Sequence, residues 1–116
     1  MGLKLTQVCV DAHDPAALGA WWAEVLGWKH HVDSDGDVVL TPPPGQGPPW
    51  LFLAVPDGKV VKNRLHLDFT PEDQQVEVDR VIALGARQVD IGQGEQTWVV
   101  LADPEGNEFC ILAAEV

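Results

Sequence analysis

The pattern of apolar and polar positions along this chain repeats one order of predicted elements twice. In the first half, alternation with a period of two predicts strands, and apolar residues at helical spacing predict one helix after the first of them. The predicted strands of this half cover residues 3–11, 28–32, 37–41 and 50–55. Asp33-Ser34-Asp35-Gly36 supplies the residue types of a tight turn between the second and third strands.

The helix of the first half has clear start and stop signals. Asp14 is a typical N-cap, Pro15 fits the first helical turn, and Gly27 ends the pattern. The residues predicted to face the core are Leu18, Trp21, Trp22, Val25 and Leu26. Residues 42–49, which are rich in proline, are predicted to form a stiff surface loop because proline donates no backbone hydrogen bond.

The second half repeats this order of elements. Its predicted strands cover residues 64–69, 86–91, 97–101 and 108–113. A helix is predicted from Thr70-Pro71-Glu72-Asp73, which is close to a capping box, to Gly85. Its predicted buried residues are Val78, Val81, Ile82 and Leu84. Asp103-Pro104-Glu105-Gly106-Asn107 has the composition of a hairpin turn rather than of a catalytic group.

Matched residues in the predicted strands and at the helix ends recur in the two halves at a nearly constant separation along the chain. The matched pairs are Gln7 with His66, Asp14 with Asp73, Gly27 with Gly85, and Leu53 with Cys110. Few residues are identical between the halves, so the repeat depends on the order of elements. The sequence therefore predicts two βαβββ modules, over about residues 3–57 and 62–115, in one domain spanning residues 1–116.

Alternation assigns the strand residues to two faces. One face is predicted to pack on the helices through Val8, Val10, Leu65, Leu67, Phe69, Phe109 and Ile111. The other is predicted to line a cavity through Leu5, Gln7, Cys9, Leu51, Leu53, His66, Asp68, Glu108, Cys110 and Leu112. A polar centre with apolar walls is typical of a small-molecule site, whereas a small barrel can also fill its interior with its own side chains.

Composition and charge limit the classes of partner. The chain has 116 residues with 18 acidic and 7 basic side chains, giving a formal net charge of -11. Such a protein repels phosphates, so no nucleic acid and no anionic membrane is expected, and a neutral or cationic small molecule fits better. The alternative is that the acidity only maintains solubility.

Apolar runs and cysteine spacing bear on the cellular compartment. No run of about 18 apolar residues and no signal peptide is present, so a cytoplasmic protein is expected. Cys9 and Cys110 have no short spacing that would indicate a disulfide framework or a zinc finger. Free and mostly buried thiols are expected.

Three segments together resemble a known family. They are Asp14-Pro15-Ala16-Ala17-Leu18 through Leu26-Gly27-Trp28, Lys62-Asn63-Arg64-Leu65-His66-Leu67-Asp68, and residues 101–110. They are similar to the glyoxalase-like domains of the vicinal oxygen chelate superfamily, which includes glyoxalase I, extradiol dioxygenases, fosfomycin-resistance enzymes and bleomycin-binding proteins. The resemblance implies an α+β fold whose two βαβββ modules form a half-open barrel around a central cavity with the helices outside. It also implies a homodimer.

The resemblance further implies a site for one divalent metal ion such as zinc, nickel or manganese, held by four side chains. Gln7 and His66 occupy the two ligand positions on the strands that open the modules. The two positions on the closing strands, where carboxylates are usual, fall at Leu53 and Cys110. Leucine binds no metal, and a thiolate at Cys110, with Asp68 or Glu108 nearby, would shift the preference towards zinc.

Two functions follow as expectations. The first is binding of a small organic molecule without a complete metal site, with ligand-binding residues Gln7, Cys9, Leu53, His66, Asp68, Glu108 and Cys110. The second is a metal-dependent, glyoxalase-type lyase or isomerase in which His66 is the catalytic residue that assists proton transfer next to a carbonyl. The missing carboxylates favour binding over catalysis.

Overall fold

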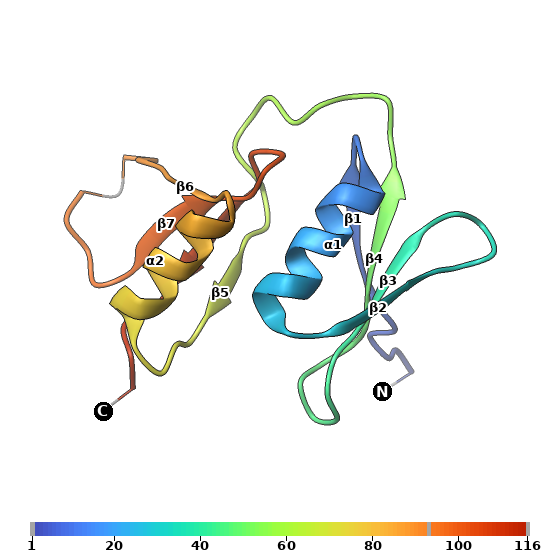
Figure 1. The fold of residues 1–116 in the computed structure, drawn as a ribbon, viewed down its shortest axis with the longest axis horizontal. Coiled ribbons are helices and arrows are strands. Elements are labelled where there is room, and N and C mark those ends of the chain that lie inside the picture. The colour runs from blue at the N-terminus through green and yellow to red at the C-terminus, as the bar shows by residue number, and fades with distance from the viewer. Residues whose placement is uncertain (1, 93, 116) are drawn as a thin grey trace. The chain divides into compact units, whose positions relative to one another are not determined.

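Two mixed four-stranded sheets, each with one helix, make up the computed structural model, which describes residues 2–92 and 94–115 (Figure 1). The elements are β1 (Val8–Ala12), α1 (Pro15–Leu26), β2 (Lys29–Val32), β3 (Val38–Thr41), β4 (Trp50–Ala54), β5 (Leu67–Phe69), α2 (Gln74–Leu84), β6 (Arg87–Gln88), β7 (Val99–Ala102) and β8 (Glu108–Ile111). The sheets have the strand orders β1-β4-β3-β2 and β5-β8-β7-β6. In each sheet the opening strand is parallel to the closing strand, and the other neighbours are antiparallel. The predicted α+β class with two βαβββ modules is confirmed.

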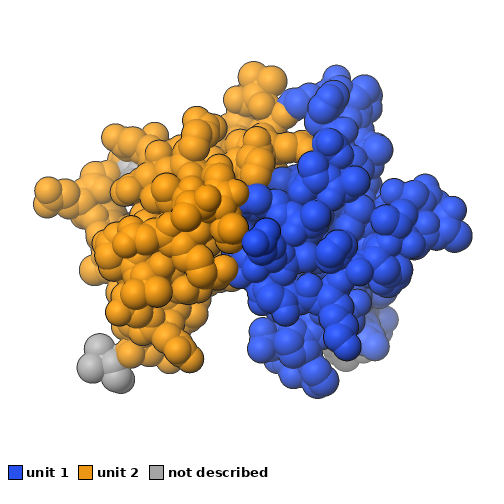
Figure 2. Space-filling view, viewed as in Figure 1, with its two compact units in different colours: residues 1–58 blue, residues 59–116 orange. Residues whose placement is uncertain are grey.

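The chain divides into two compact units, Met1–Gly58 and Lys59–Val116, which are blue and orange in Figure 2. Each unit holds one βαβββ module. Within the described residues, neither helix has the length and apolar character that crossing a membrane requires.

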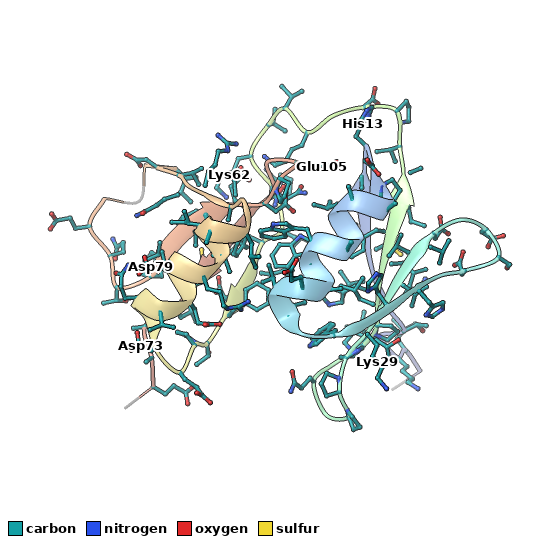
Figure 3. The ribbon with its side chains drawn as sticks, in the orientation of Figure 1. His13, Lys29, Lys62, Asp73, Asp79 and Glu105 are labelled. Atoms are coloured by element: carbon teal, nitrogen blue, oxygen red, sulfur yellow. The ribbon has the colours of Figure 1, made fainter. Side chains whose placement is uncertain are left out.

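Both helices stop at the predicted glycines, and α1 starts at its predicted cap, whereas α2 begins at Gln74, just after the predicted start at residues 70–73. The Asp14 side chain accepts a hydrogen bond from the Ala17 amide at 3.2 Å, and the Asp73 side chain, at the start of α2 in Figure 3, accepts one from the Val76 amide at 3.1 Å. These side chains satisfy amides that have no partner inside the helix. Gly27 ends α1 with a positive φ of 69°, which glycine adopts without steric cost.

The core of the first unit lies between α1 and its sheet. Trp22 and Phe52 are almost fully buried, and the Trp50 ring lies 5.6 Å from the Trp22 ring and 5.4 Å from the Trp28 ring. Gly19 brings α1 close to the sheet, because a Cβ at that position would lie 2.5 Å from Val38 Cγ1. The tryptophans predicted for the core are therefore placed there, with Trp21 half-buried at its edge.

The core of the second unit is aliphatic with one aromatic pair. Val78 and Val81 of α2 are buried, as are Phe109 and Ile111 of β8, and the Phe69 and Phe109 rings meet edge to face at 6.0 Å. The prediction for Ile82 is wrong, because 40% of this residue is exposed. Two buried positions one turn apart are enough for a helix of 11 residues to cover its sheet.

Several strands are shorter than predicted. β1 begins at Val8 rather than at residue 3, so Leu5 is 70% exposed instead of lining a cavity. The reason lies in the partner strand: β1 pairs with β4 from Val8 opposite Trp50, and the preceding Pro48 and Pro49 have no amide with which to continue the ladder. Alternating residues form a strand only where a partner supplies hydrogen bonds.

Strands of the second unit are also shorter than predicted. β5 begins at Leu67 rather than at residue 64, which places His66 just before the strand and leaves Leu65 89% exposed instead of packed on a helix. β6 is limited to Arg87–Gln88 within the predicted 86–91, and β7 begins at Val99 within the predicted 97–101. β8 begins at Glu108 as predicted and ends at Ile111 rather than at residue 113.

The two predicted hairpin turns share one geometry. Asp33 Oδ1 accepts hydrogen bonds from the Asp35 and Asp37 amides at 2.9 and 3.0 Å. Asp103 Oδ1 accepts the equivalent bonds from the Glu105 and Asn107 amides, also at 2.9 and 3.0 Å. Each turn has a glycine with positive φ at its fourth position. The Asp103–Asn107 segment is thus a structural turn, as the sequence predicts.

Candidate functional site

A hollow of about 280 Å³ lies on the second unit, on the sheet face opposite Phe109 and Ile111. It is lined by Lys62, His66, Asp68, Ile91, Trp98, Val100, Glu108, Cys110 and Leu112. Four of the predicted ligand-binding residues, His66, Asp68, Glu108 and Cys110, therefore line one hollow. Because residues two apart on a strand share a face, the alternation in β8 is what brings Glu108, Cys110 and Leu112 together.

The polar end of the hollow combines an imidazole, a carboxylate and a thiol. His66 Nε2 lies 3.3 Å from Asp68 Oδ1, with about half of each side chain exposed. Asp68 is opposite Cys110 in the ladder between β5 and β8. The ligand atoms of His66, Asp68 and Cys110 all lie within 4.8 Å of one another.

Cys110 is held as a neutral thiol. Burial raises its pKa, the charge of Asp68 and a hydrogen bond to that carboxylate raise it further, and only the charge of Lys62 opposes them. The thiol therefore donates to Asp68 and is a poor nucleophile at neutral pH, because the thiolate is the reactive form.

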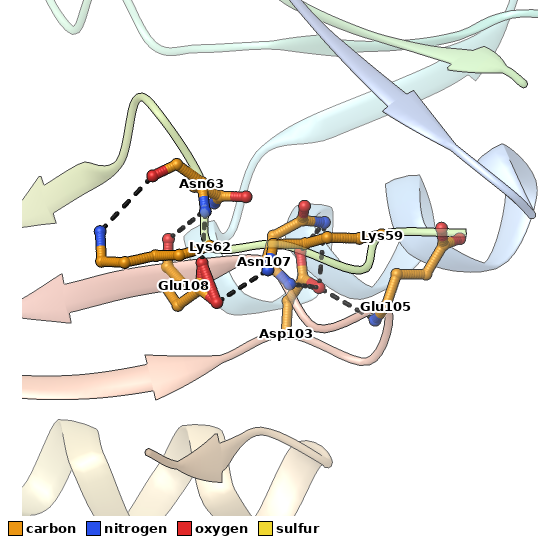
Figure 4. Close-up of polar contacts among 7 residues, drawn as sticks. All are labelled: Lys59, Lys62, Asn63, Asp103, Glu105, Asn107 and Glu108. Carbon is orange, nitrogen blue, oxygen red and sulfur yellow. Dashed lines mark hydrogen bonds and ion pairs between the residues drawn. The ribbon is translucent and has the colours of Figure 1, made fainter. Parts of the chain in front are cut away.

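Glu108 differs from the other polar residues because both of its carboxylate oxygens have partners in the protein. Oε2 accepts from Lys59 Nζ and Oε1 from the Asn63 amide, each at 2.8 Å (Figure 4). Burial by itself raises the pKa of Glu108, but the hydrogen bonds from Asn63 and Lys59 and the lysine charge together hold it below its ordinary value. Glu108 thus faces the hollow as a neutralised ion pair rather than as an unpaired carboxylate.

The apolar side of the hollow comes from Ile91, Trp98, Val100 and Leu112. The segment before Trp98 is fixed by Gln74, whose Nε2 donates to the Thr97 carbonyl at 2.8 Å and to the Ile111 carbonyl at 3.1 Å. Sequence reasoning missed Lys62, Ile91, Trp98 and Val100 as lining residues. The signal for Trp98 is a single large aromatic residue after the polar stretch of residues 92–97, where no periodicity marks a face.

The other predicted ligand-binding residues, Gln7, Cys9 and Leu53, belong to the first unit. Gln7 precedes β1, as His66 precedes β5, and its Nε2 contacts Cys9 Sγ at 3.7 Å. Cys9 and Cys110 are both free thiols, but Cys9 is exposed, so the expectation of buried thiols is wrong for it. Leu53 is half-buried in β4.

The ladders correct the internal match between Leu53 and Cys110. Cys9 pairs with Leu51 in the first unit, and Asp68 pairs with Cys110 in the second. The structural counterpart of Cys110 is therefore Leu51, two residues before Leu53. Both residues are leucines on the same strand face, so the position still lacks a metal ligand.

The donor atoms of the second unit decide which metal ion would fit. His66, Asp68 and Cys110 offer one nitrogen, one oxygen and one sulfur atom in close proximity, after loss of the Cys110 proton. This mixed set fits a borderline ion such as zinc better than manganese, which prefers oxygen ligands. Glu108 adds no ligand while Lys59 and Asn63 hold its oxygens.

Comparison with known families identifies the chain. A family model described as "Glyoxalase-like domain" matches residues 7–112, which includes every element of both modules. The chain belongs to the glyoxalase-like domain family. A comparison of this glyoxalase-like protein with curated proteins finds no match.

Solved structures share the fold over nearly the whole chain. The fosfomycin resistance protein FosX from Listeria monocytogenes, complexed with Mn(II) and sulfate, is 16% identical, with a TM-score of 0.72 and coverage of 100% of this chain and 94% of that one. A bleomycin resistance determinant encoded on the transposon Tn5 is 15% identical, with a TM-score of 0.63 and coverage of 98% and 100%. A glyoxalase/bleomycin resistance protein/dioxygenase family enzyme from Burkholderia phytofirmans PsJN is 21% identical, with a TM-score of 0.69 and coverage of 91% and 94%. These likenesses confirm the predicted fold.

Proposed function

We propose that this glyoxalase-like protein binds a small organic molecule, neutral or cationic, in the hollow of the second unit. The observation that carries the proposal is the division of that hollow into a polar end, formed by His66, Asp68 and Cys110, and an apolar wall that includes Trp98. A volume of about 280 Å³ is near the lower limit of ligand pockets and suits a compact molecule. Gln7, Cys9 and Leu53 of the first unit remain predicted ligand-binding residues.

The charges around the hollow support a neutral or cationic ligand. Lys59 neutralises Glu108, whereas the Asp68 carboxylate, beside His66, has about half of its side chain exposed. Lys62 lines the hollow and donates to the Asn63 carbonyl at 3.4 Å. A ligand with a hydrogen-bond donor or a cationic group would meet Asp68, and its apolar part would cover Trp98.

A fragment screen tests this proposal. Neutral, cationic and anionic aromatic fragments, with bleomycin and fosfomycin as two further probes, are added to ¹⁵N-labelled protein, and amide and indole shifts are followed by NMR. We expect neutral and cationic fragments to shift Trp98 and residues 66–68, with affinity reduced about tenfold by Asp68→Asn. Asp57→Asn, the same change at an exposed aspartate of the first unit, is the matched control and is expected to have no effect. Preference for anions, or shifts away from the hollow, would contradict the proposal.

A second function is favoured by the proximity of His66, Asp68 and Cys110. As a metal-dependent lyase or isomerase, the protein would hold one divalent ion, zinc, nickel or manganese, with His66 as ligand and Gln7 as the predicted second ligand. The ion would polarise a substrate carbonyl, and this chain's part would be to hold the ion and exclude water through the apolar wall.

Metal analysis separates the two functions. The protein is purified without added metal and its zinc, nickel and manganese contents are measured, then compared with those of His66→Ala. A stoichiometric ion that is lost in His66→Ala would establish the metal site and contradict binding without a metal. No ion, and no response to added zinc, nickel or manganese, would exclude the lyase. The predicted homodimer is a separate proposal, which light scattering after size-exclusion chromatography tests.

A further inference from the structure

The ladder between β5 and β8 ends abruptly on the side of the hollow. Its first pair is Leu67 with Phe109, and the next residue towards the N-terminus of β8 is Glu108. Glu108 does not pair with His66. Glu108 contacts Asn63 instead. Two contacts that β8 makes from the neighbouring residues Glu108 and Phe109 therefore lie four positions apart, at residues 63 and 67, on the other side. Residues 63–66 thus form a short excursion from the sheet, closed at both ends by β8.

Three contacts hold the first end of this excursion. The Asn63 amide donates to Glu108 Oε1 at 2.8 Å, Asn63 Nδ2 donates to the Glu108 carbonyl at 3.2 Å, and Lys59 Nζ donates to Glu108 Oε2 at 2.8 Å (Figure 4). The Lys59 and Glu108 side chains are only 18% and 13% exposed. Water therefore competes weakly for these bonds, which are strengthened because the acceptor is charged.

The side chains around the excursion keep the two faces of a strand. Leu65, inside the excursion, is 89% exposed, whereas His66, at its end, and Lys62, just before it, line the hollow together with Asp68. What departs from a regular ladder is that Glu108 bonds to Asn63, four positions before Leu67.

We propose that Glu108 is a positioning residue: its carboxylate fastens residues 59–63 to β8 and so holds His66 beside Asp68 in the hollow. Glu108 then contributes to ligand binding through His66 and Lys62 rather than by contacting the ligand. The consequence for binding rests on the proposed function, but the geometric claim does not.

Hydrogen exchange tests the geometric claim without any ligand. In the full chain, exchange of the Asn63 amide is measured by NMR under native conditions. We expect it to be about tenfold faster or more in Glu108→Ala. A smaller increase is expected in Glu108→Gln, whose amide oxygen still accepts from Asn63, and in Lys59→Met, which loses only the ion pair. Glu115→Gln, the same change at an exposed glutamate beyond β8, is the control. Unchanged exchange in Glu108→Ala would overturn the proposal; if that variant does not fold, unchanged exchange in both Glu108→Gln and Lys59→Met would do so.

A double-mutant comparison tests whether Glu108 acts on His66 and not only on stability. The imidazole proton signals of His66 are assigned from their loss in His66→Gln. Asp68→Asn is expected to shift these signals in the wild-type background, because Asp68 Oδ1 lies 3.3 Å from His66 Nε2. The shift is expected to fall by at least about half in the Glu108→Gln background. A shift of equal size in both backgrounds would overturn the positioning role.

The two proposals fail in different ways. If fragments do not bind the wild-type protein but Glu108→Ala still accelerates exchange at Asn63 and Glu108→Gln still weakens the coupling between His66 and Asp68, the proposed function fails and the positioning role stands. If fragments bind equally well to wild type and to Glu108→Gln while the coupling is unchanged, the function stands and the positioning role is overturned.

Discussion

The two modules share one topology but differ at the strand pair that opens and closes each of them. In the first unit, β1 and β4 pair over five residues, whereas in the second unit β5 and β8 pair over three. The register makes Pro49 the counterpart of Glu108, since each immediately precedes the residue opposite the start of the opening strand. The Pro49 carbonyl accepts from the Val8 amide at 3.0 Å and simply extends the ladder. Glu108 also accepts from Asn63, through both its carbonyl and its side chain, and so holds the chain that precedes β5.

The comparison shows that two modules of the same topology can differ in the side chains on their sheets, with the polar cluster in the second module. The first unit has an aromatic core around Trp50 and leucines at positions 51 and 53 of its open face. The second unit has Asp68, Cys110 and an excursion that carries His66. His66 keeps the face that alternation with Asp68 predicts, and the contacts of Glu108 hold the chain that precedes His66.

The largest expected effect tests the difference between the two cores. Trp50 and its register counterpart Phe109 are both buried, but Trp50 contacts the rings of Trp22, Trp28 and Phe52, whereas Phe109 contacts that of Phe69. We expect Trp50→Ala to lower the free energy of unfolding by about 4–5 kcal/mol and Phe109→Ala by about 3 kcal/mol. Urea denaturation measures both, and Trp50→Leu and Phe109→Leu replace them if the alanine variants do not fold. A loss of free energy of unfolding in Phe109→Ala that equals or exceeds the loss in Trp50→Ala would contradict the expected difference between the two cores.

A smaller effect tests how closely each helix approaches its sheet. Gly19 of α1 and Val78 of α2 occupy the same position five residues after their N-caps, and both are buried. A methyl group at Gly19 would collide with Val38, so we expect Gly19→Ala to cost about 1–3 kcal/mol, although alanine favours helices. In the Val38→Ala background the cost is expected to shrink, because the colliding atom is gone. Thermal or urea unfolding measures the four proteins, and strict additivity would show that Val38 is not the obstacle.

The smallest effect is the dependence of the Glu108 contacts on pH. Because the pKa of Glu108 is lower in the folded protein than its ordinary value of 4.5, its carboxylate stabilises the fold above that value. The contribution is lost as the pH falls through the lowered pKa. We expect Glu108→Gln to cost about 1–2 kcal/mol at pH 7 and progressively less below pH 4.5, while Glu115→Gln changes little at any pH. Urea unfolding at pH 7 and at pH values below 4.5 measures this cost in free energy of unfolding. A cost of Glu108→Gln that does not depend on pH would contradict the ionic role of Glu108.

Local sequence signals determined the framework of this protein. Asp14, Gly27 and Asp73 mark the helix ends because capping is decided by a few neighbouring residues. The Asp33 and Asp103 turns follow from side chains that bond to amides two and four residues away. The alternation in β8 likewise predicted that Glu108 and Cys110 would share a face with Asp68, because period two is a property of the strand itself.

Only the tertiary structure decided what happens where distant segments meet. The register that matches Leu51 rather than Leu53 with Cys110 depends on how β1 pairs with β4 some 40 residues later. Lys59 and Asn63 reach Glu108 across separations of 49 and 45 residues, and no local pattern encodes such contacts. Hence the sequence by itself placed His66 on a strand, while the structure places it at the end of an excursion held by Glu108. The physical reason is that a strand's length and a carboxylate's partners are set by the neighbouring chain, not by the residue's own sequence.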